Sequence, residues 1–291
     1  MFGLGTFADA GGAFAGVVVG ERVLRVDGTA RELLGDWDRL GALAEGDGDW
    51  RPLQDLRVLP PVTPVHVFQS GANYRRHVLD IIVAEERERG TMSDEEARAM
   101  GERIMDERAT TGEPYVFLGA PGAMCGAYDD VVLPKAGEQH DWELELAGVF
   151  GAGGAIAGYT IANDLTTRDF VYRPDLKAIG TDWLRSKNAP TFLPVGPWIV
   201  PAPFVPDPMD LRITLRLNGD VMQDESTADM IFDVERLRAH VLAIAAVVPG
   251  DLLLTGSPAG NGMHHRRFLQ PGDVMESEIT GLGTQRNRCV A

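Results

Sequence analysis

The sequence predicts a β-rich α+β fold, and two observations lead to this prediction. From about residue 114 onward, short apolar runs are separated by Gly and Pro, as in residues 213–217 before Asn218-Gly219 and in residues 251–255. One later stretch, residues 233–247, clearly carries apolar side chains at helical spacing. Many strands with few helices argue against repeated βαβ units, in which each strand would be followed by a helix.

The beginning of the chain predicts a small strand-rich domain. The runs 16–20 and 23–26 indicate hairpins with Asp27-Gly28 as a turn, and residues 31–43 are expected to form a helix. The proline-rich segment 59–64 predicts a connector. We therefore expect a small N-terminal domain over residues 1–60 and a catalytic domain over residues 61–291.

The segment after the connector predicts two charged helices. The first begins at about Arg75, and the second runs to about Thr111 after a capping box in which Ser93 precedes Glu96 by three residues. Both carry more charged than apolar side chains, which is typical of an exposed pair. Residues 83–112 are thus expected to be a helical insertion that serves as a lid or as a subunit contact.

Composition restricts the partners and the location of the protein. The chain has 291 residues, of which 44% are hydrophobic, and a net charge of −16. That charge repels phosphate backbones and anionic lipids, so neither nucleic acid nor a membrane is an expected partner. Two widely separated cysteines, an N-terminus without a basic region and the lack of a long uncharged apolar run favour a cytoplasmic protein.

The most informative segment is 141–146, Asp-Trp-Glu-Leu-Glu-Leu. Its strict alternation predicts a strand with three apolar side chains on one face and three carboxylates on the other. A fourth acid, Asp164, follows a second strand-like run over residues 159–163. Such acids are costly to bury together unless a cation neutralises them, and oxygen ligands suit Mg²⁺ or Mn²⁺. The alternative is a strand face that water solvates.

Five motifs follow one another in a fixed order along the chain. They are residues 71–77 (Gly-Ala-Asn-Tyr-Arg-Arg-His), 141–146, 158–169, 194–198 and 249–258. Together they resemble the fumarylacetoacetate hydrolase family, over residues 60–291, and the opening unit is similar to the family's small N-terminal domain. The resemblance is to the branch of acylpyruvate hydrolases and 2-hydroxyhepta-2,4-diene-1,7-dioate isomerases. It implies a catalytic domain built as a mixed β-sandwich or roll.

The resemblance implies a metal site and a catalytic pair. Glu143, Glu145 and Asp164 match the family's ligands for Mg²⁺ (or Mn²⁺), and residues i and i+2 of a strand do point to the same side. His77 matches the catalytic histidine. Asp80 lies one helical turn further on and is expected to orient His77, although the family usually has Glu at this position. From the spacing alone, His77 and Asp80 could also be a casual surface pair.

Further matches concern the substrate. Lys187 matches a lysine that meets the substrate's oxygens, and Thr255 begins a loop that offers a hydroxyl and N–H groups to a substrate carboxylate. Tyr74, from the first motif, is assigned to substrate binding as well. Arg168 could bind a carboxylate of the substrate or pair with an acid such as Asp169. Three departures bear on the substrate: Val171 and Pro190 stand where relatives often have Gln and Asp, and the stretch between His77 and Tyr115 is longer than in compact members. Together they indicate a larger or less polar substrate than a simple acylpyruvate.

The function that we expect from this resemblance is metal-dependent hydrolysis of a C–C bond in a 2-oxo or 1,3-dicarbonyl acid, of acylpyruvate or fumarylpyruvate type. In it, His77 activates water and the metal stabilises an enolate. Isomerisation, decarboxylation or dehydration of a related 2-oxo acid could use the same site. A non-catalytic metal-binding protein is a further alternative. The resemblance also implies a homodimer.

Overall fold

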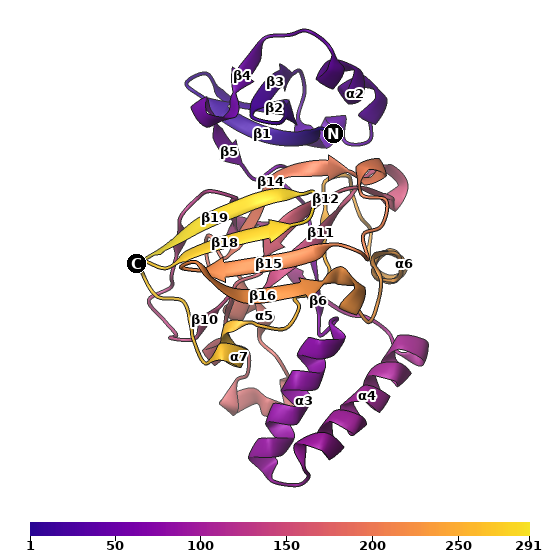
Figure 1. Cartoon of the computed structure of the whole chain (residues 1–291), viewed down its shortest axis with the longest axis vertical. Coiled ribbons are helices and arrows are strands. Elements are labelled where there is room, and N and C mark those ends of the chain that lie inside the picture. The colour runs from indigo at the N-terminus through magenta and orange to yellow at the C-terminus, as the bar shows by residue number, and fades with distance from the viewer.

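The computed structural model describes residues 1–291, apart from the side chains at positions 176, 177 and 179. It confirms the predicted strand-rich α+β class. Figure 1 shows the N-terminal strands at one end of the molecule, a β-rich body in the middle and a helical hairpin at the other end. None of the described helices combines the length and the hydropathy that a membrane span requires.

The N-terminal residues form a meander that joins the body through one strand. β1 pairs with β14 of the body at Leu4 and Ile199. The strands of this end are β1 (Gly3–Asp9), β2 (Gly12–Val19), β3 (Arg22–Val26), β4 (Trp50–Pro52) and β5 (Arg57–Leu59). The N-terminal strands therefore continue the large sheet of the body. That residues 1–60 form a separate domain stays a prediction.

The helix expected over residues 31–43 consists of two helices. α1 (Ala30–Leu33) begins at a capping box formed by Thr29 and Glu32, and α2 (Trp37–Glu45) follows after a short break. Gly35 lies in the break with a φ of 91°. Glycine adopts this left-handed conformation without steric cost, and a continuous right-handed helix has no place for it.

The body contains a large mixed sheet in which the order is β1-β14-β12-β11-β17-β6-β7 after the N-terminal strands. β11 pairs antiparallel with both β12 and β17, and β17 pairs parallel with β6. The strands are β6 (Val67–Gly71), β7 (Tyr115–Gly119), β8 (Met124–Gly126), β11 (Leu144–Phe150), β12 (Ile156–Asn163), β14 (Leu193–Pro201) and β17 (Leu252–Leu254).

A second sheet packs against this one, with the order β16-β15-β18-β19-β9. One core cluster contains Leu144 and Ile161 of the large sheet together with Ile213, Leu215 and Met275 of the second sheet, so the core lies between two layers. Figure 1 shows the second sheet in front of β11, β12 and β14. Its strands and a small separate pair are β9 (Val131–Val132), β15 (Arg212–Leu217), β16 (Asp220–Ser226), β18 (Val274–Ile279), β19 (Gly283–Val290), β10 (His140–Asp141) and β13 (Thr166–Thr167).

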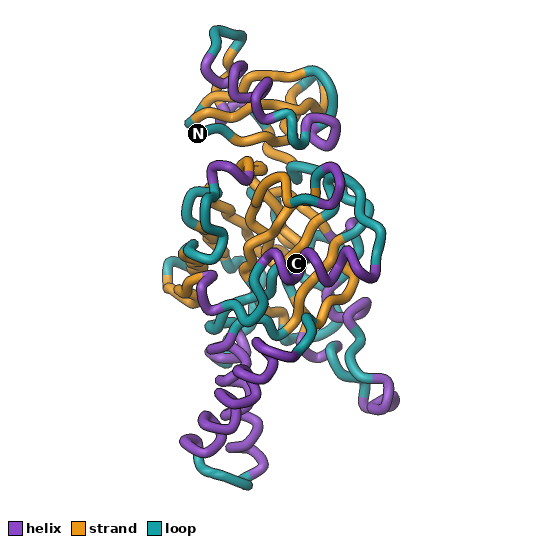
Figure 2. The backbone as a smooth tube through the Cα atoms, turned by 90° about the vertical axis from the view of Figure 1, so that its right-hand side faces the viewer, coloured by secondary structure: helices purple, strands orange, loops and turns teal.

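The predicted pair of charged helices is an antiparallel hairpin that projects from the body (Figure 2). α3 (Arg75–Arg89) and α4 (Asp94–Thr111), which begins at the predicted capping box of Ser93 and Glu96, pack through Val78, Leu79 and Met105. The remaining helices are α5 (Trp183–Lys187), α6 (Val234–Ile244) and α7 (Gly262–His265). α6 ends three residues before the predicted end at residue 247. A role of the hairpin as lid or contact stays a prediction.

Candidate metal centre

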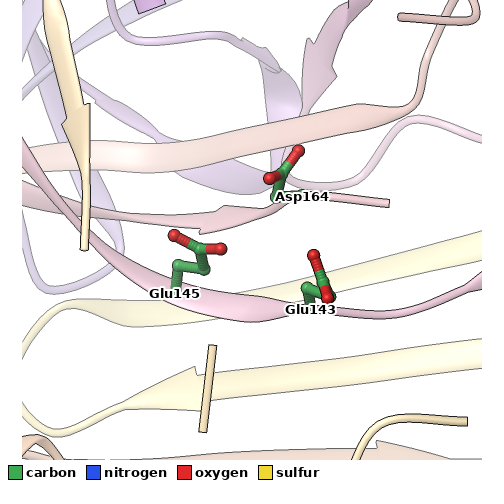
Figure 3. Close-up of side chains that lie close together, drawn as sticks. All are labelled: Glu143, Glu145 and Asp164. Carbon is green, nitrogen blue, oxygen red and sulfur yellow. The ribbon is translucent and has the colours of Figure 1, made fainter. Parts of the chain in front are cut away.

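Three buried carboxylates converge at one end of the β11–β12 hairpin (Figure 3). Glu145 lies on β11, Glu143 immediately precedes this strand, and Asp164 follows β12. The antiparallel register pairs Leu144 with Asn163 and therefore brings Asp164 beside Glu143. One ligand oxygen from each side chain lies within 4.8 Å of the others, and the three residues are 2–8% exposed. The structure thus brings together the three predicted ligands.

The strand predicted over residues 141–146 is interrupted, and both of its faces are buried. β10 ends at Asp141 and β11 begins at Leu144, so Trp142 and Glu143 lie between them. The N–H of Glu143 donates to the side-chain oxygen of Asn163, at 2.9 Å, instead of to a neighbouring strand. Because Asp141 and Glu145 are no more than 2% exposed, the alternative of a solvated face is wrong.

Two cations contact the cluster directly. The ammonium of Lys187, 4% exposed, donates to Glu143 Oε2 at 2.5 Å and to Asp164 Oδ2 at 2.6 Å. The guanidinium of Arg168 donates to Glu143 Oε1 at 2.6 Å and to Asp141 Oδ2 at 2.8 Å. Arg168 therefore pairs with acids of the site, and Asp169, the partner considered from the sequence, accepts backbone N–H groups instead.

The charges of this cluster do not balance. When all four are ionised, the buried carboxylates of Asp141, Glu143, Glu145 and Asp164 carry four negative charges against the two positive charges of Arg168 and Lys187 among the described side chains. Four minus two leaves an excess of two negative charges in a poorly solvated place. A hard divalent cation with oxygen ligands would neutralise this excess, so the donor set and the charge both fit Mg²⁺ or Mn²⁺.

The pKa values follow from burial and from these partners. Burial acts to raise the pKa of Glu143, but Arg168 and Lys187 outweigh it and hold this pKa well below its ordinary value. Glu145 lacks a direct cation contact among the described side chains, and burial followed by repulsion from Asp164 raises its pKa well above the usual range. Burial also raises the pKa of Asp164 to about 6, against the opposing effect of Lys187. Without a bound cation, Glu145 and Asp164 are therefore the two predicted ligands that take up a proton most readily.

The two residues of the predicted catalytic pair, His77 and Asp80, both lie on α3. His77 lies in the first turn of α3, and burial lowers its pKa to about 4, although the charge of Glu143 opposes this effect. The expected hydrogen bond from the His77 ring to the Asp80 carboxylate is not among those of the described side chains. Instead, Asp80 lies 3.7 Å from Arg98 and 3.9 Å from the Nδ1 of His264. The spacing of one helical turn permits contact with the imidazole, but the carboxylate of Asp80 lies near Arg98 of α4 and His264 of α7 instead.

The loop after β17 makes hydrogen bonds to β11, the strand that carries Glu145. The hydroxyl of Thr255 donates to the carbonyl of Leu146 at 2.9 Å, and the N–H of Gly256 donates to Glu145 Oε2 at 2.7 Å. Both groups expected to meet a substrate carboxylate thus already have partners in the protein. Tyr74 is fully buried, and burial, with the nearby charge of Glu145, raises its pKa well above the ordinary value. Substrate binding by Thr255 and Tyr74 stays a prediction.

Comparison with known proteins identifies the family. The sequence profile described as fumarylacetoacetate (FAA) hydrolase C-terminal matches residues 66–290 of this chain. The chain belongs to the FAA hydrolase family. The described fold and the buried acidic trio agree with this membership, and the resemblance seen in the sequence is confirmed.

Individual FAA hydrolase relatives carry different activities in their names. The chain is 38% identical over 190 residues to a mitochondrial oxaloacetate tautomerase of Homo sapiens, a match that covers 61% of this chain and 59% of that protein. It is 40% identical over 189 residues to a 2,4-didehydro-3-deoxy-L-rhamnonate hydrolase of Sphingomonas sp., covering 60% and 65%. These matches span about three fifths of each relative's own length. A solved 2-hydroxyhepta-2,4-diene-1,7-dioate isomerase from Mycobacterium marinum superposes with a TM-score of 0.72 at 28% identity, covering 100% of this chain and 98% of that one.

Two residues of this FAA hydrolase site were not assigned to it from the sequence. Asp141, which shares the predicted carboxylate face of segment 141–146 but matches no ligand of the family, is fully buried and accepts from Arg168 and from the backbone N–H of Gly262 and Met263. Gln69 on β6 donates from Nε2 to Asp164 Oδ1 at 2.5 Å. The one available signal was a glutamine inside the otherwise apolar start of a strand, Val67-Phe68-Gln69.

Proposed function

We propose that this chain is a divalent-cation-dependent enzyme that hydrolyses a C–C bond in a 2-oxo or 1,3-dicarbonyl acid, of acylpyruvate or fumarylpyruvate type. The observation that carries the proposal is the convergence of Glu143, Glu145 and Asp164 in a buried cluster with an excess of two negative charges. The hydrolase among the relatives supports this choice of reaction. A cation held by these three residues supplies Lewis acidity toward the oxygens of a bound 2-oxo acid.

The chain's own residues supply the proton transfer. Since its pKa is lowered to about 4, His77 is neutral near pH 7 and can accept a proton from water. The negative charge of Glu143 favours the imidazolium that then forms. The ammonium of Lys187, already in contact with two carboxylates, can donate to the oxygen on which negative charge develops while the C–C bond breaks.

A second candidate function is tautomerisation or isomerisation of a related 2-oxo acid. A specific observation favours it, because Asp80 makes contacts with Arg98 and His264 and none of its described hydrogen bonds orients His77. Moving a proton between two carbons or between carbon and oxygen needs a neutral base but no activated water. The tautomerase and the isomerase among the relatives are consistent with this alternative.

An ultraviolet assay separates the two functions. The purified protein, stripped of metal and resupplied with Mg²⁺ or Mn²⁺, is given a panel of acylpyruvates, fumarylpyruvate and oxaloacetate, and the loss of enol absorbance is followed together with the release of pyruvate. The variant His77→Ala tests the base. His240→Ala, which changes another partly buried histidine on a helix that contributes nothing to the cluster, is the matched control.

Each result has a defined meaning. Cation-dependent loss of absorbance with stoichiometric pyruvate from an acylpyruvate or from fumarylpyruvate, abolished by His77→Ala and kept by His240→Ala, supports hydrolysis, whereas pyruvate formed from oxaloacetate reports decarboxylation. The same loss without pyruvate supports tautomerisation. If the protein binds a cation but changes none of the compounds, enzymatic action on this substrate class is ruled out, and the proposal fails.

A further inference from the structure

Gln69 is a buried amide that contacts one of the three clustered carboxylates. It lies in the middle of β6, in register with Leu254 of β17 on one side and Phe117 of β7 on the other, and is 2% exposed. Its Nε2 donates to Asp164 Oδ1 at 2.5 Å. A carboxylate can only accept hydrogen bonds when ionised, so the NH₂ end of the amide has to face Asp164.

The other end of this amide has no partner. Gln69 Oε1 is buried without a hydrogen bond and lies against Gly119 of β7, where an added Cβ would stand 2.4 Å from it. An unpaired buried acceptor is unfavourable, so native structures contain few of them. An alanine at position 119 would also collide with the amide. Both facts indicate that this position serves the hydrogen bond to Asp164 more than it serves packing.

A similar arrangement recurs at each of the three predicted cation ligands. One oxygen of every side chain is held by a donor from a distant segment: Glu143 Oε1 by Arg168, Glu145 Oε2 by the N–H of Gly256, and Asp164 Oδ1 by Gln69. The remaining oxygens of two of these side chains, Glu143 Oε2 and Asp164 Oδ2, both accept from the ammonium of Lys187. Each of the three carboxylates thus has one oxygen held by a donor from outside the hairpin, while the second oxygens of Glu143 and Asp164 share the ammonium of Lys187.

We propose that Gln69 is a positioning residue that makes Asp164 a one-oxygen ligand and so selects a small octahedral cation over Ca²⁺. Ca²⁺ takes about six to eight oxygens and readily uses both oxygens of a carboxylate, whereas Mg²⁺ keeps a near-octahedral shell with several waters. With Asp164 Oδ1 held by the amide, a cation can reach this carboxylate only through Oδ2, where it competes with the ammonium of Lys187. The inference rests on the cation-binding part of the proposed function and is independent of which reaction the enzyme catalyses.

The test measures cation affinity directly. Calorimetric titrations of Mg²⁺ and of Ca²⁺ into the metal-stripped full chain are compared for the wild type, Gln69→Leu and Gly119→Ala. The leucine removes the donor at similar volume, while the alanine pushes on the amide and leaves its chemistry intact. Supporting groups of metal ligands typically contribute about 10- to 100-fold in affinity. We expect a loss of that order for Mg²⁺ in Gln69→Leu, a smaller loss in Gly119→Ala, and a tenfold or greater fall in the preference for Mg²⁺ over Ca²⁺.

Two matched controls separate positioning from packing. Gln285 is another buried glutamine with an unpaired Oε1, but its NH₂ donates to backbone carbonyls, so Gln285→Leu should lower stability without changing the Mg²⁺ to Ca²⁺ ratio. Gly122 has nothing within 4 Å of an added Cβ, so Gly122→Ala should leave both affinities unchanged.

The outcomes distinguish a failure of the proposed cation dependence from a failure of the inference about Gln69. If neither cation binds to the wild type, the proposed cation dependence fails and this inference fails with it. If the wild type binds Mg²⁺ but Gln69→Leu and Gly119→Ala lower Mg²⁺ and Ca²⁺ affinity equally, or leave both within about twofold, Gln69 has no role in selection and only this inference is overturned.

Discussion

Replacing Lys187 by methionine tests two effects of its positive charge. The charge stabilises the carboxylate cluster when no divalent cation is bound, and it competes with such a cation for two carboxylate oxygens. The ammonium, 4% exposed, contacts Glu143 Oε2, Asp164 Oδ2 and the carbonyl of Asp164 at 2.5, 2.6 and 3.1 Å. Methionine has a similar length and no charge, so the cluster loses one of its two cations. Removing one partner of a buried ion pair typically costs about 3–5 kcal/mol.

This cost converts to a measurable shift in melting temperature. An unfolding entropy of about 2.1 cal/mol/K per residue gives about 0.6 kcal/mol/K for this chain, so Lys187→Met should melt about 5–8 °C lower in the presence of EDTA. Adding Mg²⁺ should then raise its melting temperature by more than the roughly 4 °C expected for wild type at a hundredfold excess over Kd, because no ammonium competes for the two oxygens.

Differential scanning fluorimetry with EDTA and with rising Mg²⁺ checks both parts. Lys135→Met, which removes an exposed lysine, is the control and should change neither value. An unchanged melting temperature of Lys187→Met in EDTA would show that the buried ion pairs are not formed. A Mg²⁺ effect no larger than that of wild type would show that the ammonium and the cation do not share ligand oxygens.

Three further predictions concern the same site. His77→Ala should lower kcat/KM by about 10²–10⁴-fold with an unchanged Kd for Mg²⁺, because a general base supplies about this factor; steady-state kinetics and calorimetry together check it, and a parallel loss of Mg²⁺ binding would contradict the assignment. Mg²⁺ affinity should weaken as the pH falls through about 6, since burial raises the pKa of Asp164 to about 6 and only the ionised carboxylate binds a cation; an affinity that stays constant from pH 8 to about 5 would refute this. Thr255→Val should lower stability by about 1 kcal/mol through the lost hydrogen bond to Leu146. If Thr255 also contacts the substrate as predicted, KM rises in the same variant, and an unchanged KM would contradict that contact.

The sequence could predict the ligands because their signal is local. Glu143 and Glu145 alternate with apolar neighbours, and Asp164 ends the next strand, so one hairpin contains the complete set. The same alternation could not tell a solvated face from a buried one, because it records only which side chains share a side. It also could not foresee the break at Trp142 and Glu143, where the side chain of Asn163 replaces a backbone partner.

What the sequence could not predict depends on partners far along the chain. Asp80 has the right spacing to reach His77, yet Arg98 and His264 lie closer to its carboxylate. Arg168 could equally have paired with Asp169 or with a substrate until the fold placed Asp141 beside it. A glutamine such as Gln69 belongs to no pattern, and its role follows only from the tertiary packing of β6.

The confinement of the three ligands to the β11–β12 hairpin has an evolutionary consequence. A hairpin of this kind is inherited as one continuous piece of chain, and insertions elsewhere leave its register untouched. The groups around it come from separate segments, His77 from α3, Lys187 from α5 and Gly256 from the loop after β17, and each can change by its own substitutions. New chemistry can therefore arise by altering these surroundings while the cation site persists. The tautomerase, hydrolase and isomerase names among the relatives are the diversity that such a modular arrangement allows.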